Sequence, residues 1–169
     1  SQDSTIDIVT KQRQIDNRIT IIDLSRNFGK EIALTAGLDY SSGDAVIVID
    51  ADLQDPPELI PKLVEKWREG YDVVNAKRIK RKGESLLKKV MSYIYYRLLF
   101  YLSDINVPRD TGDFRLLNKN ALGALLKLRE KHRYMKGLFV WVGFKQKEIE
   151  YEREARFKGK TKWGFFSLF

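Results

Sequence analysis

The sequence has no cysteine and only one histidine, His132. Without cysteine the chain can form neither disulfides nor thiolate metal sites, and this absence fits a reducing compartment. A single histidine excludes multi-histidine metal centres and most catalytic triads that use histidine as a base. These absences remove the most common thiol and imidazole chemistry from consideration.

Long apolar runs are also missing from the sequence. No uncharged apolar segment approaches the ~20 residues that a membrane-spanning helix needs, and no signal peptide opens the chain as given. We therefore expect the chain as given to be soluble or peripheral to a membrane. Its 169 residues with 43% hydrophobic content predict one domain with a substantial core.

Acidic residues are fewer than basic ones, 23 against 31, which gives a formal charge of +8. The excess is local: residues 77–89 hold seven basic residues and one acid, and residues 153–162 hold five basic residues and one acid. Such clusters favour an anionic partner, whether phosphate, nucleic acid or an acidic membrane surface. Five of the basic residues are expected at the surface, with anionic lipid as one candidate partner: Lys80, Arg81, Lys82, Lys88 and Lys89.

Apolar patterns in the first half of the chain alternate between helical and strand-like periods. The expected helices are 4–15, 30–41 and one that opens near Pro57, and the expected strands are 18–24, 45–49 and 71–78. This alternation predicts an α/β domain with a mainly parallel sheet and helices on both faces.

The second half is predicted to add a strand near 114–117, a helix that starts at 118–120 and an exposed strand over 145–154. Residues 85–102 are predicted to form an amphipathic, aromatic-rich and basic helix. Packing against its own domain and lying at a bilayer surface both remain open for this helix.

An acidic loop follows the apolar strand "AVIVI" directly. Asp50 and Asp52 lie one residue apart at the strand end, and Gln54 adds an amide oxygen. Oxygen ligands of this kind suit Mg²⁺ or Mn²⁺, which keep coordination positions for substrate phosphates. An ordinary acidic turn is the plainer interpretation, but the buried strand before the loop and the Pro-Pro-Glu helix start after it favour a metal–phosphate site. In α/β sheets, ligands bind beyond the carboxyl ends of strands, where Lys77 and Arg78 are also expected.

Three segments together carry a family resemblance: "VIDADLQDPPELIPKL", "LSRNFGKEIALTAGLDY" and "DTGDFRLLN". The chain resembles family-two glycosyltransferases of the GT-A (Rossmann-like) fold, and more narrowly those that act on polyprenyl phosphates. The resemblance implies inverting transfer of a sugar from a nucleotide-sugar donor to a polyprenyl phosphate with Mg²⁺ or Mn²⁺. It further implies that Asp50, Asp52 and Gln54 hold the metal and the donor pyrophosphate.

The resemblance also implies roles for residues outside the acidic loop. Asp113 of "TGDF" would lie near the anomeric carbon of the donor, as a base or as an orienting charge; both roles remain open because a lipid phosphate is already ionised near neutral pH. Five basic residues complete the expected site: Arg78, Arg156 and Lys162 at the phosphates, and Arg26 and Lys30 with the nucleotide region.

By the same resemblance, residues 1–169 form a single catalytic domain that lacks the first strand and the C-terminal membrane helices of its relatives. The intact protein would then lie at the cytoplasmic face of a bacterial inner membrane, with the membrane surface as a partner. UDP-glucose is the favoured donor, no nucleic-acid partner is expected, and a homo-oligomer is left open. The alternatives are another acceptor, a phosphatase with a similar Asp-x-Asp strand, or a non-catalytic basic module that binds membranes or nucleic acid.

Overall fold

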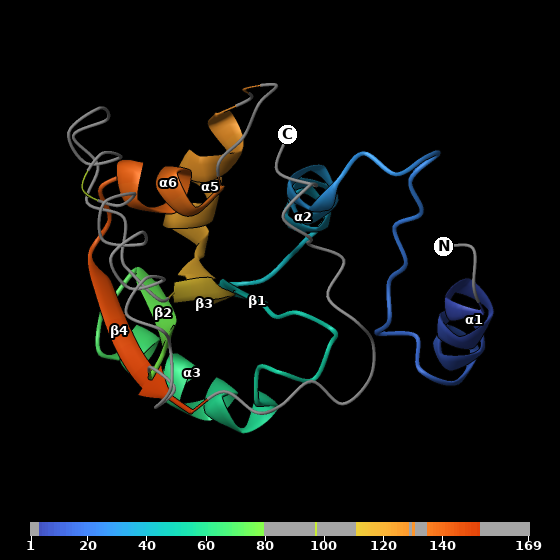
Figure 1. The fold of residues 1–169 in the computed structure, drawn as a ribbon, viewed down its shortest axis with the longest axis horizontal. Helices are drawn as coiled ribbons and strands as arrows, with labels where there is room; N and C mark the ends of the chain where they lie inside the picture. The colour runs from blue at the N-terminus through green and yellow to red at the C-terminus, as the bar shows by residue number, and fades with distance from the viewer. Residues whose placement is uncertain (1–3, 80–96, 98–110, 129, 131–134, 153–169) are drawn as a thin grey trace. The chain divides into compact units, whose positions relative to one another are not determined.

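The computed structural model describes residues 4–79, 97, 111–128, 130 and 135–152 (Figure 1). The chain divides into two compact units, Ser1–Ser41 and Ser42–Phe169.

The first unit contains two helices, as the sequence predicts. Helix α1 spans Thr5–Ile15 and helix α2 spans Lys30–Asp39. Gly29 precedes α2 with φ 89°, a left-handed conformation that glycine adopts without steric cost. The prediction of a strand over 18–24 is wrong, because these residues form no regular element. Their β-branched side chains favour extended backbone, but a strand also needs a neighbour to accept its hydrogen bonds, and none of the described strands pairs with them.

The second unit is built on a four-stranded sheet in the order β1-β3-β2-β4. The strands are β1 (Ala45–Val48), β2 (Val73–Arg78), β3 (Thr111–Asn118) and β4 (Gln146–Tyr151). Strands β1, β2 and β4 run in one direction, as expected for a mainly parallel sheet. Strand β3 runs against them between β1 and β2, so two of the three pairings are antiparallel and only β2–β4 is parallel.

In the described part of this unit, four helical segments with defined bounds accompany the sheet. They are the 3₁₀ turn η1 (Pro57–Leu59), α3 (Ile60–Arg68), α5 (Lys119–Lys127) and α6 (Met135–Trp141). Proline at the start of both η1 and α3 suits a helix N-terminus, where the missing N–H has no intrahelical partner.

Helices cover both faces of the sheet, as the sequence predicts. On one face, Leu59 and Leu63 pack against Val74 and Phe114 in a buried cluster. Alternation along β3 sends Arg115 to the opposite face, where its guanidinium lies 3.8 Å from the centre of the Phe139 ring of α6. The α/β class is therefore confirmed, with the helices placed on each side by the period-two alternation of the strands.

The amphipathic helix expected over 85–102 lies outside the described residues except for Arg97, which is helical. Among the helices that the structure describes, none combines the length and the apolar character needed to cross a bilayer.

Candidate functional site

One end of the sheet gathers the chemically important residues. Strands β1, β2 and β4 finish at this end, and β3 begins there. Val48, the last residue of β1, lies opposite Arg115 of the antiparallel β3. Asp50 comes two residues after Val48 and Asp113 comes two residues before Arg115, so both lie toward the same end of the sheet. The carboxyl ends of β1 and β2 thus bring Asp50 and Arg78 to one edge of the sheet, and the antiparallel β3 brings Asp113 to that edge near its beginning.

The acidic loop after β1 turns sharply. The Asp52 side chain accepts a hydrogen bond from the backbone N–H of Gln54 at 3.2 Å, the contact of an Asx-type turn. Leu53 between them has φ 59°, which is uncommon for a residue with a side chain. The turn carries Gln54 and Asp55 inward, so that they are only 8% and 1% exposed, while Asp50 and Asp52 stay half-buried.

The donor set of this loop fits a hard divalent cation. Asp50 and Asp52 supply carboxylate oxygens, and Gln54 supplies an amide oxygen from the same short segment. Mg²⁺ and Mn²⁺ sites that also bind substrate phosphates use only a few protein ligands, because the phosphates and water fill the remaining coordination positions. Within the described ranges, no group of three or more histidine, cysteine or acidic residues forms a complete metal cage.

Arg78, the last residue of β2, is held by two residues that the sequence did not identify. Its Nε donates a hydrogen bond to the Tyr151 hydroxyl at 3.1 Å, and its Nη2 lies 3.6 Å from Oδ1 of Asp55. The Tyr151 hydroxyl in turn donates a short hydrogen bond to the same Asp55 oxygen. A chain of contacts therefore runs from the arginine through the tyrosine to a buried carboxylate.

The electrostatics of this group follow from its burial and its charges. Burial lowers the pKa of Arg78, but the hydrogen bond to Tyr151 and the negative charges of Asp55 and Asp50 outweigh it and raise the pKa above its ordinary value. Burial and the hydrogen bond to Asp55 raise the pKa of Tyr151. Arg78 therefore stays cationic and Tyr151 stays protonated at neutral pH.

The "TGDFR" segment of β3 lies against Arg78 on one side and α6 on the other. A Cβ at Gly112 would lie 2.5 Å from Nη2 of Arg78, so the guanidinium rests directly over this glycine. Arg115 is 2% exposed and donates a hydrogen bond to the Gly112 carbonyl at 2.7 Å. Strand alternation places Asp113 on the Arg115 side of the sheet, opposite the side on which Gly112 meets Arg78.

The four remaining basic residues of the predicted site belong to the first unit or lie outside the described residues. Arg26 and Lys30 belong to the first unit, where the Arg26 guanidinium lies 4.5 Å from the centre of the Phe28 ring and Lys30 opens α2. Arg156 and Lys162 lie outside the described residues.

Three contributors to the site were missed by sequence reasoning: Asp55, Gly112 and Tyr151. The alternating pattern of β4 does place Tyr151 on the same face as Ile149, which packs against the core. That pattern predicts burial for Tyr151, but it cannot reveal that the hydroxyl meets a residue from the acidic loop.

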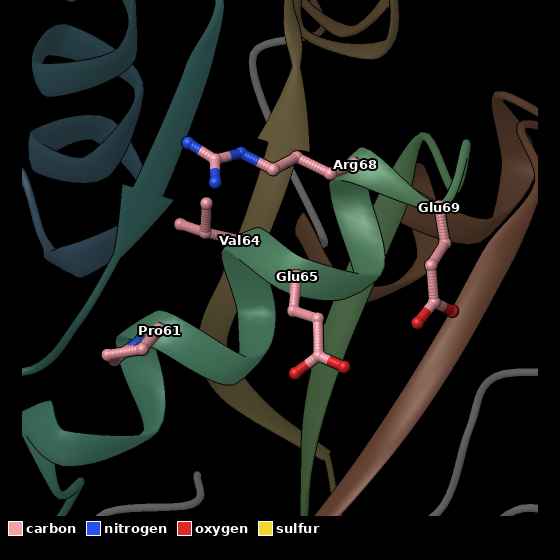
Figure 2. Close-up of a pocket in the computed structure, with 5 residues that line it drawn as sticks. All are labelled: Pro61, Val64, Glu65, Arg68 and Glu69. Atoms are coloured by element: carbon pink, nitrogen blue, oxygen red, sulfur yellow. The ribbon is translucent and has the colours of Figure 1, made fainter.

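A separate surface groove lies on α3 and contains none of these residues. Its volume is about 410 Å³, and it is lined by Pro61, Val64, Glu65, Arg68 and Glu69. Figure 2 shows Arg68 pointing away from Glu65 and Glu69, so the groove has no convergent charged group.

Comparison with known proteins agrees with the resemblance drawn from the sequence motifs. The model of "Glycosyl transferase family 2" matches residues 1–126. "Uncharacterized glycosyltransferase YkcC" of Bacillus subtilis is 53% identical over 163 residues, which are 96% of this chain and 50% of the relative. "Prophage bactoprenol glucosyl transferase homolog" of Escherichia coli is 40% identical over 168 residues, which are 99% of this chain and 55% of the relative.

The chain thus spans about half the length of the curated relatives it matches. A solved structure, the bifunctional IspDF from Campylobacter jejuni, is similar with a TM-score of 0.53 at 13% identity, over 85% of this chain and 35% of that one. This likeness concerns the fold alone, and it agrees with the α/β architecture. The family model, the named relatives and the motifs all agree: the chain belongs to glycosyl transferase family 2.

Proposed function

We propose that this chain is the catalytic part of a longer membrane-associated enzyme that transfers a sugar from a nucleotide-sugar to a polyprenyl phosphate. UDP-glucose is the proposed donor, and the reaction inverts the anomeric configuration. The proposal is supported by membership of the family and by relatives that are named bactoprenol glucosyl transferases or homologues of them.

The observation that supports the proposal is that Asp50, Arg78 and Asp113 lie at the same end of the sheet. This edge offers carboxylates for a cation and a guanidinium for a phosphate. A basic module that only binds membranes or nucleic acid would need the cationic residues, but it would not need the acidic loop or the "TGDFR" segment.

In the proposed reaction, an oxygen of the lipid phosphate forms a bond to the anomeric carbon of the sugar, and the bond from that carbon to the nucleoside diphosphate breaks. The leaving diphosphate keeps the electron pair. Mg²⁺ or Mn²⁺ held by Asp50, Asp52 and Gln54 supplies neutralisation of the diphosphate charge when it is bound.

Arg78 is proposed to bind and orient the acceptor phosphate, because a guanidinium binds phosphate oxygens in pairs and reduces repulsion between two anionic substrates. Arg156 and Lys162 are proposed to add positive charge to the same phosphates. Asp113 is proposed to orient the acceptor and its cationic partners, with little proton removal because the phosphate is already ionised.

The nucleotide is proposed to bind near Arg26 and Lys30. The proposed location is the cytoplasmic face of the bacterial inner membrane, where the basic segments would face anionic lipid. Nucleic acid is not a proposed partner, and the proposal does not depend on the oligomeric state.

The test is a radiolabelled-sugar transfer assay on the full-length gene product, with undecaprenyl phosphate and a panel of nucleotide-sugars. We expect labelled lipid with one donor, loss of labelling with EDTA and recovery with Mg²⁺ or Mn²⁺. Asp50→Asn should lower the rate by at least about a hundredfold, on the scale of a lost electrostatic transition-state contact.

Asp44→Asn is the matched control, because Asp44 is exposed and precedes β1 at the opposite end of the strand. It should leave the rate unchanged. If no donor labels the lipid in the presence of metal, the acceptor assignment fails. If labelling survives EDTA and Asp50→Asn alike, the metal role of the loop fails.

A further inference from the structure

The contacts of Arg78 differ from those of an ordinary surface arginine. Its side chain is 25% exposed, whereas the Asp55 side chain beneath it is 1% exposed. The Nε group is engaged by the Tyr151 hydroxyl rather than by water. One end of the arginine is thus anchored inside the protein while the rest reaches the edge of the sheet.

Asp55 is buried more completely than a structural carboxylate usually is without a full set of partners. Its Oδ1 accepts from Tyr151 and faces Arg78, while its Oδ2 has no hydrogen-bond partner among the described residues. Burying a carboxylate costs free energy unless charge and hydrogen bonds compensate. Burial of Asp55 therefore costs free energy, and the contacts that compensate for it are those with Tyr151 and Arg78.

The geometry also fixes where the guanidinium lies. Gly112 leaves room for it, since a Cβ there would lie 2.5 Å from Nη2. The Tyr151 ring is itself held edge-on against Phe114, with ring centres 6.1 Å apart. A rigid ring, a buried carboxylate and an open glycine together restrict a side chain that otherwise has many rotamers.

We propose that Asp55 and Tyr151 are positioning residues that hold the Arg78 guanidinium, over Gly112, in the orientation that binds the acceptor phosphate. This inference rests on the proposed function, because it takes the ligand of Arg78 to be the phosphate of the acceptor. Tyr151 takes the Nε–H, and Nη2 faces Asp55 at 3.6 Å without a hydrogen bond to it, so the N–H groups of the terminal nitrogens remain the donors for a phosphate. Preorganisation of this kind removes an entropic cost that a free arginine would pay on binding.

The inference predicts that removal of one hydroxyl weakens acceptor binding and little else. Tyr151→Phe keeps the ring and its contact with Phe114 but breaks both hydrogen bonds. In the full-length gene product, we expect the KM for undecaprenyl phosphate to rise about tenfold, the effect of losing a hydrogen bond to a charged group. The kcat and the KM for the nucleotide-sugar should stay close to those of the unchanged protein.

Tyr71→Phe is the matched control. Tyr71 is also a partly buried tyrosine at the edge of the same core, but its ring contacts Lys145 rather than Arg78. It should leave the acceptor KM unchanged. Asp55→Asn still accepts the tyrosine hydrogen bond but loses the charge, so it should raise the acceptor KM by less than Tyr151→Phe does.

A double-mutant cycle separates positioning from general stability. If Tyr151 acts through Arg78, adding Tyr151→Phe to Arg78→Lys should cause no further rise in the acceptor KM. An equal rise in both backgrounds, or an acceptor KM in Tyr151→Phe equal to that in Tyr71→Phe, would overturn the inference.

A binding measurement distinguishes this inference from the proposed function. Farnesyl phosphate should raise the melting temperature of the unchanged protein more than that of Tyr151→Phe, whether or not sugar is transferred. If transfer to every prenyl phosphate is absent but this difference is present, the proposed reaction fails and the positioning role stands. If farnesyl phosphate shifts both proteins equally, the positioning role fails.

Discussion

Leu53 lies in the acidic loop with a backbone conformation that L-residues rarely adopt. Its φ of 59° falls in the left-handed region, and its side chain is 60% exposed. Because the side chain has little contact to compensate for the strain, the turn between Asp52 and Gln54 is what holds this conformation. Strain of this kind is concentrated at functional sites, which agrees with the role proposed for the loop.

Replacing Leu53 with glycine should remove the strain. We expect Leu53→Gly to raise the free energy of unfolding by up to about 1 kcal/mol, since the left-handed conformation costs a non-glycine residue about 1–2 kcal/mol and glycine loses part of that gain through unfolded-state entropy. Chemical denaturation measures the change. Leu53→Ala is the control, because it shortens the side chain and keeps the strain. A loss of stability in Leu53→Gly would show that the leucine side chain makes a contact that outweighs the strain.

The raised pKa of Tyr151 predicts how the free energy of unfolding changes at alkaline pH. Burial and the hydrogen bond to Asp55 favour the protonated phenol in the folded state. A group whose pKa is raised on folding stabilises the fold below its unfolded pKa, which is about 10 for tyrosine, and loses that contribution as the pH rises through the folded value. The free energy of unfolding should therefore fall at high pH more steeply in the unchanged protein than in Tyr151→Phe. Equal slopes above pH ~10 would contradict the raised pKa.

At the scale of elements, the start of α5 shows how a local signal and a tertiary contact combine. Asn118 ends β3 and caps α5, and its side chain accepts a hydrogen bond from the backbone N–H of Ala121 at 2.8 Å. The same side chain donates to Asp72 at 2.6 Å. The sequence predicts a helix start at 118–120, because asparagine before a helical pattern is a common start signal. It does not predict the contact with Asp72, which is distant in the chain.

Loss of this cap should be measurable. Asn118→Ala should lower the free energy of unfolding by about 1–2 kcal/mol, the usual cost of an asparagine cap with one further hydrogen bond lost. Asn120→Ala is the control, because Asn120 is exposed within the same helix. A similar loss in both variants would mean that the effect comes from helix propensity and not from the cap.

Most elements of the chain could be predicted because their signals are local. The helices at 4–15 and 30–41, the strands near 45 and 73 and the helix after Pro57 follow from periodicity and capping alone. The strand predicted over 18–24 failed because strand formation depends on a partner as well as on β-branched residues. The reversed direction of β3 could not be derived from periodicity, since the alternation of side chains is the same in both directions.

The candidate site was predictable to a similar extent. Asp50 and Arg78 could be placed together because the carboxyl ends of co-directional strands meet at one edge of a sheet, whereas Asp113 was expected there only from the family resemblance. The link between Asp55 and Tyr151 could not be predicted, because it joins two residues far apart in the chain through a hydrogen bond that no local pattern records. The roles of all the predicted site residues stay predictions. They are Asp50, Asp52, Gln54, Arg78, Asp113, Arg26 and Lys30, together with Arg156 and Lys162 outside the described residues.

For the molecule as a whole, the charge of +8 predicts binding to anionic membranes. The chain should bind vesicles that contain anionic lipid and detach as salt rises, because each basic residue at such a surface contributes about 1 kcal/mol and salt screens it. Reversing two charges with Lys88→Glu and Lys89→Glu should weaken binding by at least about tenfold.

Neutral vesicles and a second pair of changes provide the controls for this experiment. Lys11→Glu with Lys62→Glu changes the net charge equally at exposed positions on α1 and α3. If this pair weakens binding as much as the first, total charge and not a basic segment governs the interaction.

The reversed strand β3 has a consequence for the order in which the protein can be made. During translation, β1 and β2 leave the ribosome before β3, although β3 is the strand that lies between them and bonds to both. The edges of β1 and β2 that pair with β3 therefore lack this partner strand until Thr111–Asn118 has emerged. When β3 inserts, it joins β1 to β2 and brings Asp113 to the end of the sheet where Asp50 follows β1. Strand β4, which carries Tyr151, is made later still, so a nascent chain acquires this edge only after all four strands have emerged.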